Sequence, residues 1–329
     1  MMRITILFGG TNTERLVSVA SAQALHEALP EADLWFWDVS DTVHEVQSQA
    51  LRRHARPFED PFKPGTRGIG LEQALDQAKA EQRLLVLALH GGRAENGELQ
   101  VMCEMLGIPF TGSGSASSHL AFDKIAAKRF AAIAGVKAPI GLRLEDIDAA
   151  LVEYDKLIAK PVRDGSSYGL IFVNSTQDLA AVRNAAKTEE YVIEPFISGV
   201  EATCGVLEQS DGSVIALPPI EIVPAEGGFD YTAKYLLKST QEICPGRFAP
   251  EITAQIMDQA VKAHQAMSCG GYSRSDFIVS QQGPVFLETN TLPGLTKASL
   301  YPKALKAQGI KFVDFLQGQI ALATKRAHK

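Results

Sequence analysis

The chain has 329 residues, with 32 Lys and Arg against 38 Asp and Glu and a formal net charge of −6. This length suits two or three domains, and the charge predicts no attraction to nucleic acid or to an anionic membrane. No apolar run is long enough to span a membrane, the start of the chain lacks a signal-peptide layout, and the four cysteines form no CxxC pair. We therefore expect a reduced, cytoplasmic protein with no membrane partner.

The first predicted element is a strand over residues 3–8, followed by Gly9-Gly10 and a helix that starts near Glu14. Strand, glycine turn and helix open an α/β sheet, and ligands gather at the carboxyl ends of its strands. Glu14 would then face the mouth of a cleft. The alternative is that Thr13 caps the helix and Glu14 only complements the helix dipole. This stretch alone leaves both interpretations open.

A second strand is predicted over residues 34–39, and residues 52–68, rich in proline, glycine and charge, predict an irregular surface connection. Residues 84–89 form a continuous apolar run, typical of a strand buried on both faces of a parallel sheet. The run ends at His90-Gly91-Gly92, and a helix is expected over 99–106. His90 is either a structural histidine or a ligand-facing one, because it follows a buried strand directly.

Residues 109–114, PFTGSG, lack the third glycine and the acidic residue of a dinucleotide-binding fingerprint, and no GxxxxGK[ST] motif occurs in the chain. A helical segment begins near Ser117, and Lys124, taken alone, is typical of an exposed helical lysine. A short strand over 156–161 then ends at Lys160-Pro161. The following Gly165–Gly169 turn, before a strand at 170–173, is either a phosphate cradle of backbone N–H groups and hydroxyls or a plain hairpin turn.

Further β-type sequence covers 190–197, 202–207 and 212–222, with Glu194 and Glu201 on either side of a turn. Residues 225–246 lose periodicity and are bounded by Gly-Gly and Pro-Gly, which predicts a mobile loop that carries Lys234 and Tyr235. Such loops often exclude water during a reaction. A helix over 252–267, a Pro/Gly loop over 290–300 and two closing helices at 302–307 and 312–321 complete the expected elements.

The most informative stretch is a predicted hairpin in which apolar runs at 277–279 and 285–287 flank a loop of about four residues. Side chains alternate along a strand, so Arg274 and Asp276 share one face, as do Glu288 and Asn290 on the returning strand. If the hairpin closes, two carboxylates and an amide converge. These are hard oxygen ligands, which suit Mg²⁺ with bound phosphates. The alternative is a solvated polar face.

The metal-binding hairpin, the Gly-Ser turn and the lysines together point to ATP-dependent phosphoryl transfer without a Walker motif. At this point the sequence resembles the ATP-grasp superfamily and, within it, the D-alanine–D-alanine ligase family. The resemblance runs along nearly the whole chain, and it rests on GGTNTERLVSVASA, HGGRAENGELQ, FTGSG with FDK, AKPVRDGSSYG, IEPFISGVEAT, DYTAKY and RSDF…LETNTLPGLTKASL. The family usually has HGxxGEDG, whereas this chain has Ala94 and Asn96 in place of the glycine and the aspartate. Residues 40–70 match nothing in the family pattern.

For the nucleotide, the resemblance implies a set of contacts spread over the second half of the chain. Lys124 and Lys160 would bind the α- and β-phosphates, and Lys234 would reach the γ-phosphate. The remaining nucleotide contacts would come from Ser166 and Ser167 in the turn and from Glu194, Ile197 and Glu201 around the adenosine. The metal ligands would be Asp276, Glu288 and Asn290, which would hold a pair of Mg²⁺ ions, with Mn²⁺ as the alternative metal.

For the two amino acids, the resemblance implies that Glu14 holds the first ammonium and forms a hydrogen-bonded trio with Ser166 and Tyr235. His90 would lie near the first carboxylate. Arg274 and the Gly294 N–H would stabilise the tetrahedral intermediate. Ser299 and the Leu300 N–H would grip the second carboxylate.

The implied fold is α+β, with three domains over 1–115, 116–193 and 194–329 and an N-terminal open parallel sheet. The implied reaction joins two D-alanines with ATP through an acylphosphate, for peptidoglycan precursor synthesis, in a homodimer. Two other interpretations stay open. One is a ligase for a different amino or hydroxy acid, which Ala94, Asn96 and residues 40–70 favour. The other is a nucleotide-binding regulator without catalysis, which the full set of candidate residues speaks against.

Overall fold

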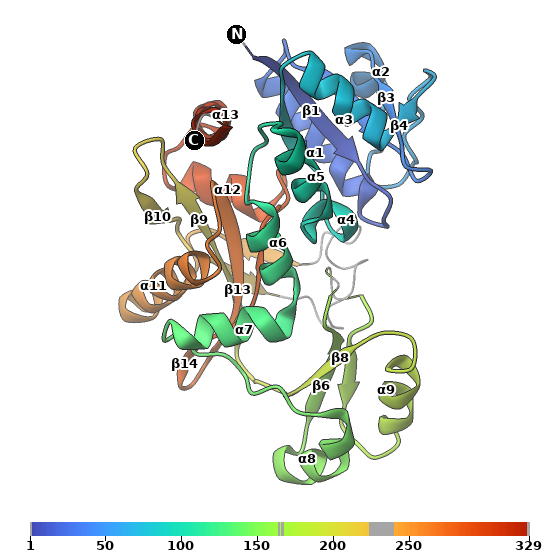
Figure 1. Ribbon diagram of the computed structural model, residues 1–329. Helices are drawn as coiled ribbons and strands as arrows, with labels where there is room; N and C mark the ends of the chain where they lie inside the picture. Colours follow the sequence, from blue (N-terminus) through green and yellow to red (C-terminus); the bar gives the residue numbers. More distant parts are fainter. Residues whose placement is uncertain (1, 164, 166–167, 224–239, 328–329) are drawn as a thin grey trace.

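The computed structural model describes residues 2–163, 165, 168–223 and 240–327. In this part of the chain the strands form three sheets, one in the N-terminal region, one in the centre and one in the C-terminal region (Figure 1). None of the described helices is long and apolar enough to cross a membrane.

The N-terminal sheet has the order β4-β3-β2-β1-β5. Its parallel centre consists of β1 (Arg3–Gly9), β2 (Asp33–Trp37) and β5 (Arg83–Ala88). The edge strands β3 (Thr42–Glu45) and β4 (Ile69–Gly70) run antiparallel to their neighbours. The expectation of an open parallel sheet is therefore correct for the centre and wrong at the edge. The irregular connection expected over 52–68 is confirmed except at Arg52 and Arg53, which end α2 (Ser48–Arg53).

Successive residues of β1 point to opposite faces of the sheet, and both faces are covered. They therefore pack into two different hydrophobic cores. Ile6 and Phe8 pack with α1 (Arg15–Ala28) and with the C-terminal helices, while Leu7 packs on the opposite side. That second side is covered by α3 (Leu71–Ala80) and α5 (Glu98–Leu106), which follows the short α4 (Gly92–Glu95). Burial on both faces explains the continuous apolar runs in β1 and β5.

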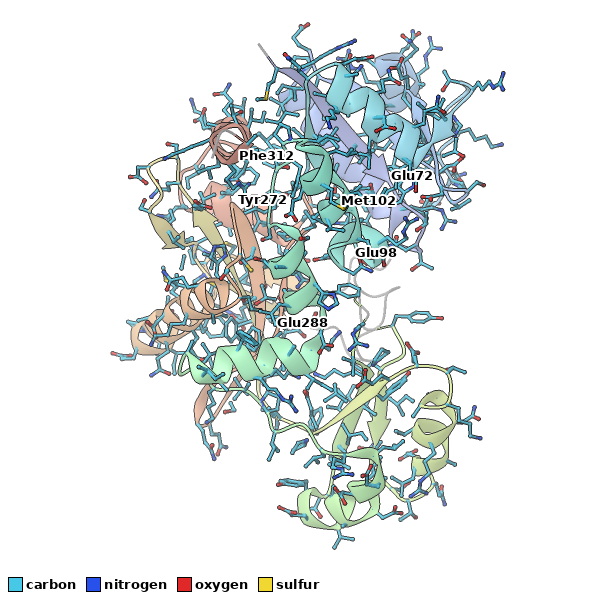
Figure 2. All side chains as sticks on the ribbon, viewed as in Figure 1. Glu72, Glu98, Met102, Tyr272, Glu288 and Phe312 are labelled. Atoms are coloured by element: carbon cyan, nitrogen blue, oxygen red, sulfur yellow. The ribbon has the colours of Figure 1, made fainter. Side chains whose placement is uncertain are left out.

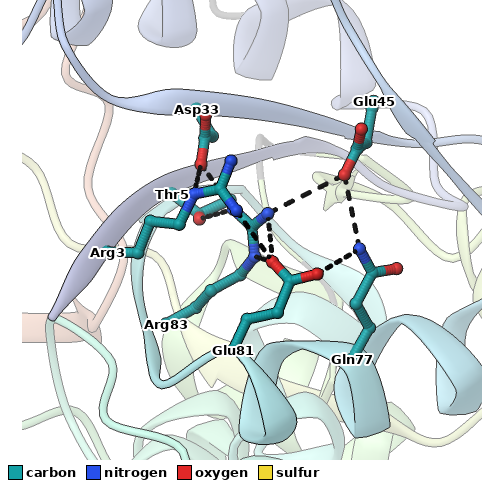
Figure 3. Close-up of polar contacts among 7 residues, drawn as sticks. All are labelled: Arg3, Thr5, Asp33, Glu45, Gln77, Glu81 and Arg83. Carbon is teal, nitrogen blue, oxygen red and sulfur yellow. Dashed lines mark hydrogen bonds and ion pairs between the residues drawn. The ribbon is translucent and has the colours of Figure 1, made fainter.

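A buried arginine anchors the amino ends of the N-terminal strands (Figure 3). Arg83 has a side chain only 1% exposed, and it pairs with Asp33 at 2.6 Å and with Glu81 at 2.6 Å. Its guanidinium also donates to Thr5 and lies 4.7 Å from the centre of the Trp35 ring. Because a buried charge needs partners, this cluster stabilises the end of the sheet opposite the strand carboxyl ends.

The central sheet has the order β7-β6-β8, with β6 (Leu157–Pro161) antiparallel to both β7 (Ile171–Val173) and β8 (Tyr191–Pro195). It forms its own core with α8 (Ile147–Tyr154) and α9 (Leu179–Ala185), preceded by the 3-10 turn η1 (Leu144–Asp146). The strand expected over 156–161 is thus confirmed. It ends on Pro161, so Lys160 is its last residue but one.

The C-terminal sheet has the order β12-β11-β9-β13-β14, with β10 paired to β9. Its strands are β9 (Val200–Glu208), β10 (Val214–Ala216), β11 (Ile220–Val223), β12 (Gln241–Ile243), β13 (Tyr272–Ser280) and β14 (Gly283–Asn290). Strand β12 lies inside the stretch expected to be loop from 225 to 246, so that expectation is wrong for these three residues. One face of the sheet packs on α11 (Pro250–Ala266).

The helices α6 (Ser115–Phe122) and α7 (Lys124–Ile133), which the expected division placed in the central domain, share a core with the C-terminal sheet instead. The last helices, α12 (Leu300–Ala307) and α13 (Phe312–Ala327), pack against the N-terminal sheet through Tyr301 and Phe315. The three sheets follow the expected three-part order, while the exact domain bounds stay a prediction. The first and third parts are joined by one continuous core.

Candidate active site

One cavity lies where the N-terminal and C-terminal parts meet, and it encloses about 730 Å³ of space that is partly open to solvent. Eight of the residues singled out in the sequence line it: Glu14, His90, Lys124, Arg274, Asp276, Glu288, Asn290 and Gly294. Figure 2 shows Glu288 at the middle of the molecule, below the N-terminal sheet and above the central one. Residues up to 280 positions apart in sequence therefore share one cavity.

The β13–β14 hairpin forms as expected and brings its polar residues opposite one another. Arg274 pairs with Asn290, and Asp276 pairs with Glu288. The register then shifts, so that Phe277 faces Phe286 and an extra residue stands in β14 as a bulge. Bulges near functional sites change the direction of neighbouring side chains. The turn is tighter than the expected loop of about four residues, because Gly283 and Pro284 already pair within the ladder.

Asp276 is held by three neighbours inside the cavity. Arg274 donates from Nε and Nη2 to its two carboxylate oxygens, at 3.0 and 2.8 Å. Asn290 donates to Oδ2 at 3.3 Å, and the Thr203 hydroxyl donates to Oδ1 at 2.5 Å. A forked arginine–carboxylate pair is both strong and directional. The guanidinium and the carboxylate therefore have fixed positions on one wall.

The hairpin residues fit a magnesium ion that also binds phosphate. The described residues contain no group of three or more His, Cys, Asp and Glu side chains able to hold a metal by themselves. Mg²⁺ usually takes one or two carboxylates, and its other ligands are waters and substrate phosphates. Asp276 and Glu288 supply those carboxylates, and Asn290 supplies an amide oxygen once its side chain turns. The donor set thus suits Mg²⁺ that arrives with a nucleotide.

The opposite wall carries Glu14 and His90, and their positions depend on the glycines after β5. A Cβ on Gly91 would lie 2.2 Å from Glu14 Oε2, so the carboxylate rests against that backbone. The His90 carbonyl accepts a hydrogen bond from Asn12 at 2.7 Å. Glu14 does not cap α1 through its side chain, and it lines the cavity. The interpretation in which it faces a cleft is the correct one.

His90 is buried between two partners. Burial lowers the pKa of the His90 imidazole, and the nearby Glu14 carboxylate opposes this change only in part. The neutral ring places Nδ1 2.9 Å from the Leu292 carbonyl and Nε2 3.0 Å from the Ser21 hydroxyl. Because a carbonyl only accepts, Nδ1 carries the proton and Nε2 accepts from Ser21.

The loop between β14 and α12 places Gly294 beside Ser299. A Cβ on Gly294 would lie 2.7 Å from Ser299 Oγ. Ser299 precedes the first residue of α12, Leu300, and its Oγ accepts from the Thr296 N–H at 3.1 Å instead of capping the helix. The first N–H groups of α12 therefore have no side-chain cap at this position, and such groups bind carboxylates well.

A second charged cluster lies between the central sheet and α7. Lys160 pairs with Glu194 at 2.8 Å, Lys128 pairs with the other oxygen of Glu194, and Lys124 lies 3.4 Å from Glu288. Burial lowers the pKa of Lys160 to about 8. Lys124 is only 7% exposed, so the simple interpretation of an exposed helical lysine is wrong. These cations surround the side of the cavity where phosphates would lie.

Some of the expected site residues are not brought together by the described contacts. Ile197 lies between β8 and β9, and Glu201 lies on β9 opposite Ile278; both are partly buried, and neither lines the cavity. Four further expected residues, Ser166, Ser167, Lys234 and Tyr235, lie outside the described residues.

Two site residues were missed by the sequence analysis. Glu95 is 8% exposed and lines the cavity, and Lys128 is 6% exposed beside Glu194. A signal existed for each. Glu95 is the acidic residue of the HGGRAENG stretch, and Lys128 follows Lys124 by one helical turn, which puts both on one face.

Comparisons with known proteins now decide the family. The family model described as D-ala D-ala ligase N-terminus matches residues 3–113, and the model described as D-ala D-ala ligase C-terminus matches residues 146–321. The chain belongs to the D-alanine–D-alanine ligase family. Members of this family are ATP-dependent ligases, so the protein is an enzyme with a three-part ATP-grasp fold.

Individual relatives are similar to this chain over nearly its whole length. The D-alanine--D-alanine ligase of Cupriavidus taiwanensis is 34% identical, over 99% of this chain and 93% of that protein. The crystal structure of VanG D-Ala:D-Ser ligase from Enterococcus faecalis is 31% identical with a TM-score of 0.79, covering 98% of this chain and 99% of the other. The D-alanine--D-alanine ligase from Bacillus anthracis complexed with ATP is 26% identical with a TM-score of 0.76, covering 100% and 98%.

Proposed function

We propose that this protein joins two D-alanine molecules to D-alanyl-D-alanine at the expense of ATP, for peptidoglycan precursor synthesis. The main support for this proposal is that one cavity has Glu14 and His90 on one wall and Arg274, Asp276 and Glu288 on the other. One wall offers an anion for an ammonium group, and the other offers groups for a metal-bound phosphate. A ligase that activates a carboxylate with ATP needs both.

In this mechanism the first D-alanine is held by its ammonium at Glu14, with His90 near its carboxylate. That carboxylate attacks the γ-phosphate of ATP, and ADP leaves from an acylphosphate. The amino group of the second D-alanine, whose carboxylate is gripped by Ser299 and the Leu300 N–H, then attacks the acyl carbon. Phosphate leaves as the peptide bond forms. Arg274 and the Gly294 N–H would stabilise the oxyanion of the tetrahedral intermediate, and such electrostatic stabilisation is usually the largest contribution to catalysis.

The charged residues around the cavity support a nucleotide site there. Lys124 and Lys160 would bind the α- and β-phosphates, and Asp276, Glu288 and Asn290 would hold Mg²⁺. The bound metal would neutralise phosphate charge and orient the γ-phosphate. The number of metal ions, a homodimeric state, a cytoplasmic location and the adenosine contacts of Glu194, Ile197 and Glu201 stay predictions.

The test of the proposed activity is phosphate release from ATP by the purified protein. We expect release that depends on D-alanine and on Mg²⁺, with D-alanyl-D-alanine as the product by mass spectrometry. A screen of other amino and hydroxy acids serves as the control. Phosphate release with another acid but none with D-alanine would reject D-alanine as the substrate.

A second candidate differs only in the second substrate. The structural relative from Enterococcus faecalis is named a D-Ala:D-Ser ligase and is 31% identical to this chain. In addition, Ala94 and Asn96 differ from the usual family pattern, and they flank Glu95 on the cavity wall. A competition between D-alanine and D-serine, with the ratio of dipeptide products as the readout, separates the two candidates.

The placement of Glu14 makes a further prediction about Gly91. In Gly91→Ala the new Cβ would lie 2.2 Å from Glu14 Oε2, at a φ of +61°. We expect the Glu14 carboxylate to shift and the KM for the first D-alanine to rise by about tenfold, which corresponds to the loss of a single hydrogen bond to a charged group.

The matched control is Gly107→Ala, because Gly107 has a similar φ of +70° and no atom within 4 Å of the new Cβ. Alanine at position 107 would occupy the left-handed helical region (φ 70°, ψ 28°), at a cost of about 1–2 kcal/mol. Gly91 has φ 61° and ψ 177°, a region almost restricted to glycine, so Gly91→Ala should lose more stability and the two variants are compared by their KM. Gly107→Ala should therefore lower stability alone and leave KM unchanged. Equal kinetic effects in the two variants would contradict the proposed position of Glu14.

A further inference from the structure

The loop that carries Gly294 and Ser299 is held from the N-terminal part of the chain by a buried carboxylate. Glu95 ends α4, and its Oε1 accepts the N–H groups of Thr291 at 3.0 Å and Leu292 at 3.1 Å. Its Oε2 accepts the N–H of Gly91 at 3.0 Å. One side chain thus joins the segment after β5 to the segment after β14.

Two further hydrogen bonds hold the same loop against the N-terminal part of the chain. His90 Nδ1 donates to the Leu292 carbonyl at 2.9 Å, and the Leu295 N–H donates to the Ser21 hydroxyl at 3.4 Å. Gly294 therefore stands between two residues that are each fixed to the N-terminal part. Thr291 directly follows Asn290, the last residue of β14, so the fixed segment begins where the hairpin ends.

A carboxylate suits this position better than an amide. Three backbone N–H groups point at Glu95, and a carboxylate offers acceptors on both of its oxygens. A glutamine at position 95 could accept hydrogen bonds through its one oxygen only. Its NH₂ group would face the N–H group or groups on the other side and could not accept a hydrogen bond from them. Burial and the nearby Glu14 carboxylate raise the pKa of Glu95 to about 7, so the protein maintains this acidic group in an unfavourable environment. Such a cost is typical of a functional position.

We infer that Glu95 is a positioning residue, which sets the distance between the first-substrate wall at Glu14 and His90 and the second-substrate loop at Gly294 and Ser299. The inference rests on the proposed function for the assignment of the two substrates. Glu95 acts through the loop backbone and does not itself touch the reacting atoms. The second amine must approach an acyl carbon held by the other wall, and misplacement by a fraction of an ångström slows such a step.

The kinetic test compares Glu95→Gln with Glu98→Gln. Glu98 lies in the same stretch at the start of α5 and is exposed (Figure 2), and among the described residues its side chain bonds to Arg93 and Asn96. For Glu95→Gln we expect kcat to fall and the KM for the second D-alanine to rise, each by roughly tenfold or more, with the KM for ATP unchanged. Glu98→Gln should match the wild type. Unchanged kinetics in Glu95→Gln, or an equal rise in the KM for ATP, would overturn the inference.

A second measurement does not depend on the ligase activity. Hydrogen exchange of a peptide that covers residues 289–296 should be faster in Glu95→Gln than in the wild type, because the Thr291 and Leu292 amides lose a charged acceptor. A peptide from β1 should exchange as before. Faster exchange without the expected kinetics would leave Glu95 as a structural clamp and reject its positioning role; unchanged exchange would reject the clamp itself. Failure of D-alanine as a substrate in the wild type would be seen separately, in phosphate release.

Discussion

Replacing Arg274 with alanine is expected to lower kcat by about 10²- to 10³-fold, the usual cost of losing one group that stabilises an oxyanion. The guanidinium lies on the cavity wall, fixed in a fork to Asp276 at 3.0 and 2.8 Å. Arg274 lies on the hairpin face beside the candidate metal ligands, so its charge is close to where we expect the reacting groups. ATP binding should survive, because the lysines around Glu194 and Glu288 are untouched. Stopped-flow phosphate release and calorimetric ATP titration measure the two quantities.

The matched control is Arg247→Ala. Arg247 forms a similar fork on Glu221, at 2.9 and 2.7 Å, on a strand of the same sheet outside the cavity. Its loss should lower stability and leave kcat within a factor of about two. Arg274→Lys tests the fork itself, since lysine keeps the charge without the planar geometry. Wild-type turnover in Arg274→Ala would remove the residue from the mechanism.

Replacing Glu288 with glutamine is expected to lower kcat/KM for ATP by roughly 10²- to 10³-fold, because a metal ion contributes several kcal/mol of charge stabilisation. Glu288 stands opposite Asp276 in the hairpin, and among the described residues it forms an ion pair with Lys124 at 3.4 Å. Without the carboxylate, the site keeps one charged ligand and loses much of its attraction for Mg²⁺. The measurement is the Mg²⁺ concentration that gives half-maximal turnover, which should rise steeply.

Glu242→Gln is the corresponding control. The Glu242 side chain is 25% exposed and pairs with Lys303, whereas that of Glu288 is 28% exposed and pairs with Lys124, so the two glutamates have similar surroundings. Glu242 lies on β12, outside the cavity lining. The two variants should therefore differ in Mg²⁺ dependence and not in folding. The same Mg²⁺ requirement in both would place the metal elsewhere.

The hairpin was predictable from the sequence because its signal is local. Alternating apolar and polar residues on either side of a turn fix which side chains share a face of each strand, and the structure brings Asp276 and Glu288 opposite one another. The bulge next to Asp276 was not predictable, because the alternation does not mark Leu287 as an extra residue; without it Asp276 would face Leu287 instead of Glu288. The turn is also shorter than expected, because the ladder extends to Gly283, inside the four residues predicted as loop.

The remaining errors concern contacts between distant segments. Glu95 bonds to residues almost 200 positions away, and no periodicity within HGGRAENG indicates that partner. Lys128 has a helical spacing that equally fits an exposed face, and only the approach of the central sheet buries it against Glu194. The edge strands β3 and β4 are four and two residues long, too short for a clear pattern.

The most direct test is a crystal structure of the protein with ADP, Mg²⁺ and a phosphinate mimic of the tetrahedral intermediate. We predict metal density within about 2.0–2.1 Å of carboxylate oxygens, the usual Mg²⁺–oxygen distance. The ligands should be Asp276, Glu288 and Asn290, with the Arg274 guanidinium on the mimic's oxyanion. A nucleotide whose phosphates lie away from the β13–β14 hairpin, or a metal held by other side chains, would contradict the account.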